Sequence, residues 1–455
     1  MPADSDKIVV RKRVHRSTEQ VVVGVFICLI ALFFFGWAMG RTSYDTFGAA
    51  LICPVLVLLT IPLVMRSARR DGDPVLVRIV MLALAVKFAG ALVRYSVAYD
   101  LYGGTADAYT YHILGSQLAH SIRQGHFVVP SAQIGTQFIV VLTGLAYAVV
   151  GSTKLGGFFL FAWLGFLGQY LFYRAFRIGF PAGDMRRYAL LVFFLPSEVF
   201  WPASLGKESW MTLMLGIFAY GAAKMLGRRH GGFLWVAVGL WGAGAVRPHV
   251  ALIGIAALCV VYPFRRARAE HAANPAVKAA GLLALTVAAL LILQKSNSFF
   301  GVQALDPQTV TKVLQTTATQ TSIGGSAFTP HLASNPVNFP IAFVTVLFRP
   351  FPQEAHNFQA LLAAAEGVFL MALIMFSFAR LRALPKLALR HSYLLFSLVY
   401  VLAFVFAFSS VGNFGILVRE RVQVLPFLMV PLCVPAVPKP QHKKGNVAVA
   451  RAGAS

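Results

Sequence analysis

The stretch VLVRIVMLALAVKFAGALVRYSV, residues 75–97, runs almost directly into YDLYGGTADAYTYH, residues 99–112, and this junction decides the fold. The first part has about the 20 apolar residues that a helix needs to cross the hydrocarbon core of a bilayer. The second part is polar, carries the carboxylates of Asp100 and Asp107, and has between them a glycine pair that permits a sharp turn. We therefore expect a membrane-spanning helix that leads into an acidic loop.

The composition of the whole chain indicates a polytopic membrane protein. Of 455 residues, 58% are hydrophobic and only 12% are charged. The net charge of +24 comes from basic residues that lie in short clusters between apolar segments, as in the cytoplasmic loops of membrane proteins. This distribution argues against a nucleic-acid partner. The cysteines all fall within apolar runs and lack the spacing of a disulfide or zinc site: Cys28, Cys53, Cys259 and Cys433.

The order of apolar segments and basic clusters predicts an all-α protein with about 12 spans and both termini in the cytoplasm. Basic tails at 1–19 and 438–455 flank a single transmembrane domain at 20–437. To keep the basic loops inside, 133–151 must be re-entrant or shallow, and 339–348 must not cross fully. The expected spans are 20–40, 47–65, 75–97, 155–174, 188–204, 209–226, 232–246, 249–263, 277–294, 358–379, 392–411 and 421–437.

Two outer loops follow from this topology. The loop at 98–132 contains a half-polar helix that begins near Asp107, places His112 on its polar face and suits the membrane interface. Asp107 is either a functional carboxylate or simply the N-cap of that helix. The loop at 295–338 is large, polar and rich in threonine, and is either a mobile cover over a site or a passive connector.

The outer face collects an unusual number of charged groups, although outer loops are normally poor in Arg and Lys. Several such groups in one protein favour an anion site, whereas a single arginine can simply extend its charge to the interface. Lys87 lies mid-span on the same helix face as Arg94. We expect it either to pair with a buried carboxylate or to form the floor of a polar cavity. The outer set comprises Arg94, Asp100, Asp107, Lys207, Glu208, Arg247, His249, Arg349, Glu354, Arg419 and Arg421.

The motifs of other functional classes are missing from the sequence. There is no G-x-x-x-x-G-K-[ST], no G-x-G-x-x-G after a strand, no H-E-x-x-H and no paired-cysteine metal site. A mechanism driven by cytoplasmic nucleotide is therefore poorly supported. The sequence assigns no metal ligands and leaves the use of a divalent cation open.

The layout from about 75 to 350 resembles the C-type (GT-C) glycosyltransferases, which include protein O-mannosyltransferases and aminoarabinose transferases. The shared features are an acidic residue in the first large outer loop, an interfacial helix (DAYTYH, 107–112), a shallow apolar helix and a bundle of about a dozen spans. Departures are the two spans that precede the span leading into the loop, and the lack of an acidic pair beside Asp107. The segment NFGILVRER, 413–421, also resembles arginine-bearing segments of lipid-linked polysaccharide polymerases.

The resemblance implies a transferase that uses a polyprenyl-phosphate sugar and a lipid or glycan acceptor at the outer face of the plasma membrane, with inversion. By position, Asp107 is the base, with Asp100, Glu208 and Glu354 as replacements. Lys87, His112 and Lys207 have supporting roles, and Glu354 and His249 orient the cations. A polymerase of lipid-linked oligosaccharides and a transporter of an anionic lipid are the alternatives. The residues that would bind the donor phosphate are Arg94, Arg247, His249, Arg349, Arg419 and Arg421.

Overall fold

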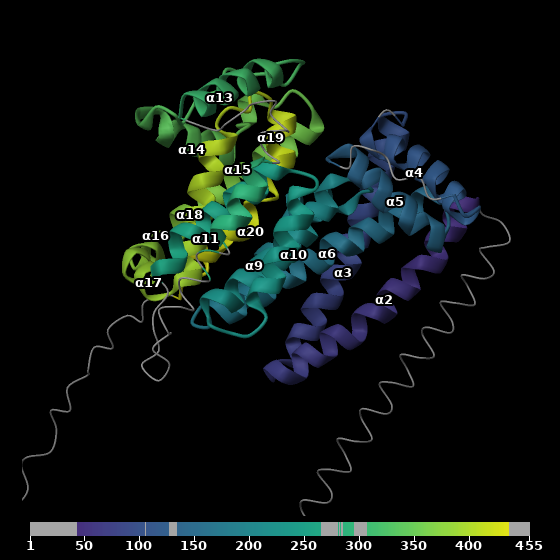
Figure 1. Cartoon of the computed structure of the whole chain (residues 1–455), viewed down its shortest axis with the longest axis horizontal. Helices are drawn as coiled ribbons and strands as arrows, with labels where there is room; N and C mark the ends of the chain where they lie inside the picture. Colours follow the sequence, from purple (N-terminus) through teal and green to yellow (C-terminus); the bar gives the residue numbers. More distant parts are fainter. Residues whose placement is uncertain are drawn as a thin grey trace, which may run out of the picture. The chain divides into compact units, whose positions relative to one another are not determined.

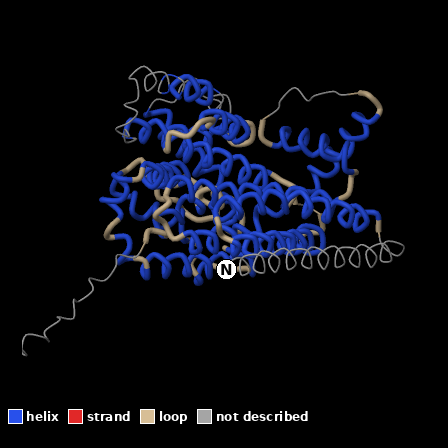
Figure 2. Tube along the Cα trace, turned by 90° about the horizontal axis from the view of Figure 1, so that it is seen from below, coloured by secondary structure: helices blue, strands red, loops and turns tan. Residues whose placement is uncertain are grey.

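The computed structural model describes residues 43–104, 106–126, 134–264, 281, 283, 285–294 and 307–435 (Figures 1 and 2). These parts of the chain are predominantly helical and hold no strand beyond one antiparallel bridge between Ala327 and Asn413. The all-α class is thereby confirmed. The predicted span 20–40 and both predicted tails lie outside the described residues.

The chain divides into two compact units, the first reaching from the N-terminal side to Leu164 and adding Pro202–Ser209. The second contains Gly165–Trp201 and everything from Trp210 onward. In unit 1 the helices are α2 (Tyr44–Asp71), α3 (Pro74–Ser96), the π-helix η1 (Val97–Leu101), α4 (Asp107–Arg123), α5 (Thr136–Val150) and the first part of α6 (Lys154–Gly179).

Unit 2 is built from the rest of α6 and the helices that follow it, except that the end of η2 and the first residues of α9, within Pro202–Ser209, belong to unit 1. They are α7 (Met185–Phe194), α8 (Pro196–Phe200), η2 (Trp201–Ala203), α9 (Lys207–Leu226), α10 (Gly232–Gly244), α11 (Pro248–Val261), η3 (Tyr262–Phe264), α13 (Pro307–Thr321), η5 (Pro336–Asn338), α14 (Phe339–Phe348), η6 (Pro352–Glu354), α15 (Phe358–Phe376), α16 (Phe378–Leu381), α17 (Leu384–Arg390), α18 (Ser392–Phe408), α19 (Phe414–Arg421) and α20 (Leu425–Leu432).

In unit 1, α2 and α3 form a tight hairpin (Figure 1). Gly72 closes α2 with φ 64°, a left-handed conformation that favours glycine. Asp73 then caps α3 by accepting the Val75 N–H at 3.1 Å, and Pro74 stands at the first helical position, where its missing donor costs nothing. The local sequence GDP therefore ends one long apolar helix and starts the next.

Helices α4 and α5 of unit 1 lie side by side and run in the same direction. Gly115 meets Thr143, while further along both helices the Arg123 guanidinium donates to the carbonyl oxygens of Tyr147 and Ala148. With 15 residues, α5 is only about 22 Å long, too short for a straight crossing of the ~30 Å hydrocarbon core. This length agrees with the expectation that 133–151 does not cross fully.

The core of unit 2 surrounds α18. One face of this helix buries a ladder of aromatic side chains, and α11, α14, α17 and α20 pack against it. Phe427 of α20 lies 4.0 Å from the Tyr400 ring, centroid to centroid. The aromatic spacing of four residues places these rings on one stripe of the helix. They are Tyr400, Phe404 and Phe408, preceded by Tyr393 and Phe396.

Four of the described helices are long and apolar enough to cross a membrane: Tyr44–Asp71, Val75–Leu101, Lys154–Gly179 and Gln359–Phe376. They coincide with the predicted spans 47–65, 75–97, 155–174 and 358–379. A fifth crossing is reached only if Leu384–Arg390 and Ser392–Phe408, bent by 115°, are one span.

The expected count of about twelve spans is therefore not found in the part of the chain that the structure describes. The predicted span 188–204 is broken at Leu195 before Pro196, because a residue before proline avoids the helical conformation. The predicted spans 232–246 and 249–263 are helices of 13 and 14 residues. Within 421–437 the only described helix, α20, has eight residues. The predicted span 277–294 lies partly outside the described residues.

Candidate functional site

The acidic loop, residues 100–107, leaves α3 through the π-helical turn η1. Gly103 and Gly104 then reverse the chain with φ 56° and 78°, and the Gly104 N–H donates to the Ala98 carbonyl oxygen at 3.0 Å. A π-helical turn at the end of a span is uncommon and often marks a functional site. Asp100, in this turn, is exposed.

Asp107 is the first residue of α4 and is exposed. Ala106 occupies the N-cap position, and the structure shows no side-chain capping hydrogen bond there. The simple N-cap interpretation of Asp107 is therefore wrong, although a carboxylate in the first turn is still favoured by the helix dipole. Asp100 and Asp107 thus flank the glycine turn as two accessible carboxylates.

Next to this loop lies a group of polar side chains from four α-helices and the π-helix η1 of unit 1. His112 Nδ1 is 3.0 Å from the Tyr147 hydroxyl, and burial lowers the pKa of His112, with Lys154 adding to the effect against the opposing charge of Asp45. Asp45 accepts the Lys154 N–H at 2.8 Å, which joins α2 to the start of α6. The Lys154 ammonium in turn lies 5.3 Å from the centre of the Tyr99 ring. This arrangement holds the base of the acidic loop.

Four further predicted site residues lie in unit 1. Lys87 is 1% exposed in the middle of α3, and Arg94 is half-buried one heptad later. Glu208, also 1% exposed, and the half-buried Lys207 start α9. The Glu208 carboxylate and the Tyr111 ring both border Gly206. The sequence anticipated polar groups here, but not that Glu208 would be almost fully buried.

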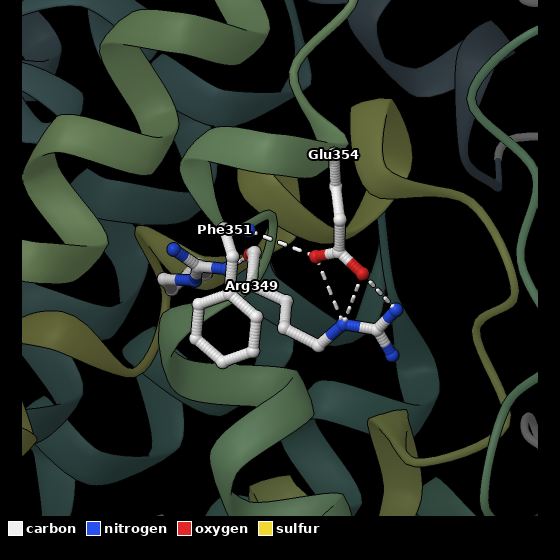
Figure 3. A network of polar contacts seen from close by, with 4 residues as sticks. Arg349, Phe351 and Glu354 are labelled. Carbon is white, nitrogen blue, oxygen red and sulfur yellow. Dashed lines mark hydrogen bonds and ion pairs between the residues drawn. The ribbon is translucent and has the colours of Figure 1, made fainter.

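In unit 2, Arg349 follows α14 and forms a bidentate pair with Glu354 (Figure 3). Arg349 Nε lies 3.1 Å from both carboxylate oxygens, Nη2 donates to Oε1, and Glu354 Oε2 also accepts the Phe351 N–H at 2.8 Å. Arg349 Nη1 makes no hydrogen bond to a residue of the described chain. The Arg349 side chain is 19% exposed.

Two rings that stack on each other lie beside the same guanidinium. The carbon of the Arg349 guanidinium lies 4.7 Å from the centre of Phe328 and 5.0 Å from that of Phe414, and the rings are 4.3 Å apart. Phe328 belongs to the segment after α13, which pairs through the Ala327–Asn413 bridge with the start of α19. Aromatic contacts of this kind hold an arginine in place while leaving its charge intact.

Arg421 lies next to Arg349 and is 1% exposed. Its Nε donates to the Val346 carbonyl oxygen at 3.1 Å, and its Nη2 donates to the carbonyl oxygen of Arg349. Burial lowers the pKa of Arg421 to about 10, against the opposing influence of Glu366. Arg421 therefore stays charged at neutral pH and fixes the backbone that presents Arg349.

The remaining predicted cations are held in different ways. Arg247 Nη2 pairs with Glu420 Oε1 at 2.5 Å, with the Arg247 side chain 9% exposed. His249 lies with its ring 5.8 Å from that of Phe408. Arg419 is half-buried on α19.

Contacts connect Arg421, Arg349 and Glu354 into an arginine cluster within unit 2. The Arg247–Glu420 pair is next to this cluster in sequence, since Glu420 precedes Arg421 in α19. Arg94, Asp100 and Asp107 belong to unit 1. Sequence reasoning missed Phe328 and Phe414, because nothing in their local sequence marks them as partners of a distant arginine. It also missed Glu366, a single acidic residue inside an apolar span, which could have been noticed on that ground.

The described residues hold no group of three or more His, Cys, Asp or Glu side chains placed to bind a metal ion. No protein-family model, curated protein or solved structure matches the chain significantly.

Proposed function

We propose that this chain is a membrane glycosyltransferase that moves a sugar from a polyprenyl-phosphate donor to a lipid or glycan acceptor at the outer face of the plasma membrane. The observation that carries the proposal is the Arg349 guanidinium, which is held by Glu354 and two rings while its Nη1 makes no hydrogen bond to a described residue and its side chain stays 19% exposed. A planar guanidinium of this kind binds phosphate oxygens through paired hydrogen bonds. The long apolar helices support a site at a membrane.

The chemistry requires few groups. Asp107 takes the proton of the acceptor hydroxyl as that oxygen bonds to the anomeric carbon of the donor sugar. The bond from the anomeric carbon to the phosphate oxygen breaks, its electron pair leaves with the lipid phosphate, and the configuration inverts. Arg349 stabilises the charge that develops on the departing phosphate.

The structure refines the roles expected for the other arginines. Arg421 donates to two carbonyl oxygens and is almost fully buried, so we assign it the positioning of Arg349. Arg247 pairs with Glu420, as Arg349 does with Glu354, but the Arg247 side chain is less exposed, with fractions of 9% and 19%. We therefore place the main phosphate contact on Arg349.

The proposal is tested by incubating the purified protein with native lipid extract and following isoprenoid-phosphate sugars by mass spectrometry. The parent protein should consume such a lipid, and Asp107→Asn should keep its thermal stability while losing turnover. Arg349→Ala should weaken donor use roughly ten- to a hundredfold, since a charge-assisted contact contributes about 1.5–3 kcal/mol, and Arg349→Lys should recover only part.

A matched control is Arg382→Ala, because Arg382 also lies over a ring, that of Phe378 at 5.1 Å, but is exposed and outside the cluster. It should transfer sugar as well as the parent. Full activity of Asp107→Asn would remove Asp107 as the base. Lipid movement across vesicles without any transfer would show a transporter, and growth of an oligosaccharide chain on a lipid diphosphate would show a polymerase.

A further inference from the structure

A buried carboxyl group lies in the middle of α15 and has no part in the proposed transfer. Glu366 is 4% exposed and sits near the centre of Gln359–Phe376, one of the four helices that can cross a membrane. Burying an ionisable side chain at such a place costs free energy, and residues of this kind are usually functional. The groups around Glu366 determine whether its carboxyl group is protonated or ionised.

The two carboxyl oxygens of Glu366 differ in their hydrogen bonds. Oε2 accepts the backbone N–H of Ser197 at 2.6 Å. Oε1 is buried and has no hydrogen-bond partner among the described residues. Only half of the carboxyl group is thus satisfied, whereas buried polar atoms are nearly always hydrogen-bonded.

No basic group fills the open position. The elements packed against α15 are α8, α14, α16, α19 and η6. Only the Arg421 guanidinium interacts electrostatically with Glu366, and its Nε and Nη2 donate to carbonyl oxygens instead. The other charged groups have partners elsewhere or are not in contact with Glu366: Glu198, Arg349, Glu354, Arg380, Arg419 and Glu420.

We propose that Glu366 is a proton-binding site inside the membrane domain, with the proton on Oε1 in the arrangement seen here. In the protonated form, Glu366 avoids the free-energy cost of a buried negative charge on an oxygen without a hydrogen bond. Oε2 still accepts the N–H of Ser197. A metal ion is a poorer occupant, because hard cations need several oxygen ligands and one open carboxyl oxygen faces this position. The nearby charge of Arg421 makes the ionised form attainable, so the proton can be bound and released.

Infrared spectra of the full-length protein in lipid test this assignment directly. At neutral pH the parent should show the carbonyl stretch of a protonated carboxylic acid, which moves in D2O, disappears as the pH is raised, and is absent from Glu366→Gln. Gln keeps the shape and the oxygen that accepts from Ser197, so the variant is expected to fold. Glu354→Gln is the control, because that carboxylate is paired with Arg349 and its loss should leave the acid band unchanged.

If Glu366→Gln instead removes a carboxylate band and no acid band, or if the acid band responds to Na+ and not to pH, the proton-site assignment is overturned. A second measurement needs no variant. A hydrophobic carbodiimide reacts with protonated buried carboxyl groups, so the wild-type peptide that contains Glu366 should carry an adduct at neutral pH, and less of it as the pH rises. An unmodified Glu366 would contradict the proposal.

Discussion

Arg349 and Arg421 show how burial decides what an arginine can do. Both belong to the outer set expected from the sequence, and a backbone carbonyl connects them. Arg421, at 1% exposed, donates to protein carbonyl oxygens, whereas the Arg349 side chain pairs with Glu354 and is 19% exposed. Two residues of the same type therefore have two tasks, one of positioning and one of binding.

The Arg349–Glu354 pair predicts a pH dependence. Partial burial raises the pKa of Glu354, but the hydrogen bonds from Arg349 and the Phe351 N–H, with the Arg349 charge, outweigh it and lower the pKa. A lowered pKa contributes stability that is present above the unfolded value of about 4.3 and is lost as the pH falls through the folded value. At neutral pH, Glu354→Gln should therefore lose on the order of 1 kcal/mol.

Thermal melting of the parent and Glu354→Gln, measured from neutral to acidic pH, checks this. The difference in midpoint should shrink as the pH falls below about 4.3. A difference that stays constant over that range would mean that the charge of Glu354 contributes nothing.

At the scale of elements, the pairing of α4 with α5 is the feature that shapes the acidic loop. The helices approach closely at Gly115, where an added Cβ would come within 2.5 Å of the Thr143 side chain. The Arg123 guanidinium meanwhile donates to two carbonyls at the end of α5. The start of α4, and with it Asp107, is thus positioned by a packed helix pair.

Gly115→Leu should therefore destabilise the protein. Replacing glycine gains up to about 1 kcal/mol in helix propensity, but overpacking a tight contact costs roughly 1–3 kcal/mol. We therefore expect a net decrease in the free energy of unfolding. The measurement is the midpoint of thermal unfolding in detergent. Gln117→Leu, at an exposed position of α4, is the control and should change the midpoint little, and an equal effect of both variants would disprove the close approach.

At the scale of the whole molecule, the described chain is a set of apolar helices of very different lengths. Four can cross a membrane, while α5, α10, α11 and α14 have 10–15 residues each. An apolar helix of this length crosses a bilayer only together with a second short helix, or it stays on one side of the membrane. The sidedness of the loops therefore needs its own test.

Cysteine labelling with an impermeant reagent provides that test, in a background without the native cysteines. Single cysteines at 102 and 323, both at exposed positions, should react from outside, whereas cysteines at 70 and 230 should not. These last two stand among basic residues that favour the cytoplasm. Reaction at 230 from outside would place that basic loop on the wrong face and refute the topology.

The sequence alone determined the class and the long helices of this protein. The apolar run 75–97 and the turn at Gly103 and Gly104 depend on local properties: hydrophobic length and φ angles. Each acts within a few residues, so each could be predicted and appears in the structure. The position of Asp107 at the start of a helix followed from the same local rules.

Tertiary structure decided the rest. Whether an apolar segment is one span or two short helices depends on partners that bury it, as at the break before Pro196, and hydropathy does not record them. Burial likewise separated Arg421 from Arg349, brought Phe328 to a guanidinium 21 residues away, and left Glu366 Oε1 without a partner. These are long-range effects, since the electrostatics of a side chain depend on every group packed around it and not on its neighbours in sequence.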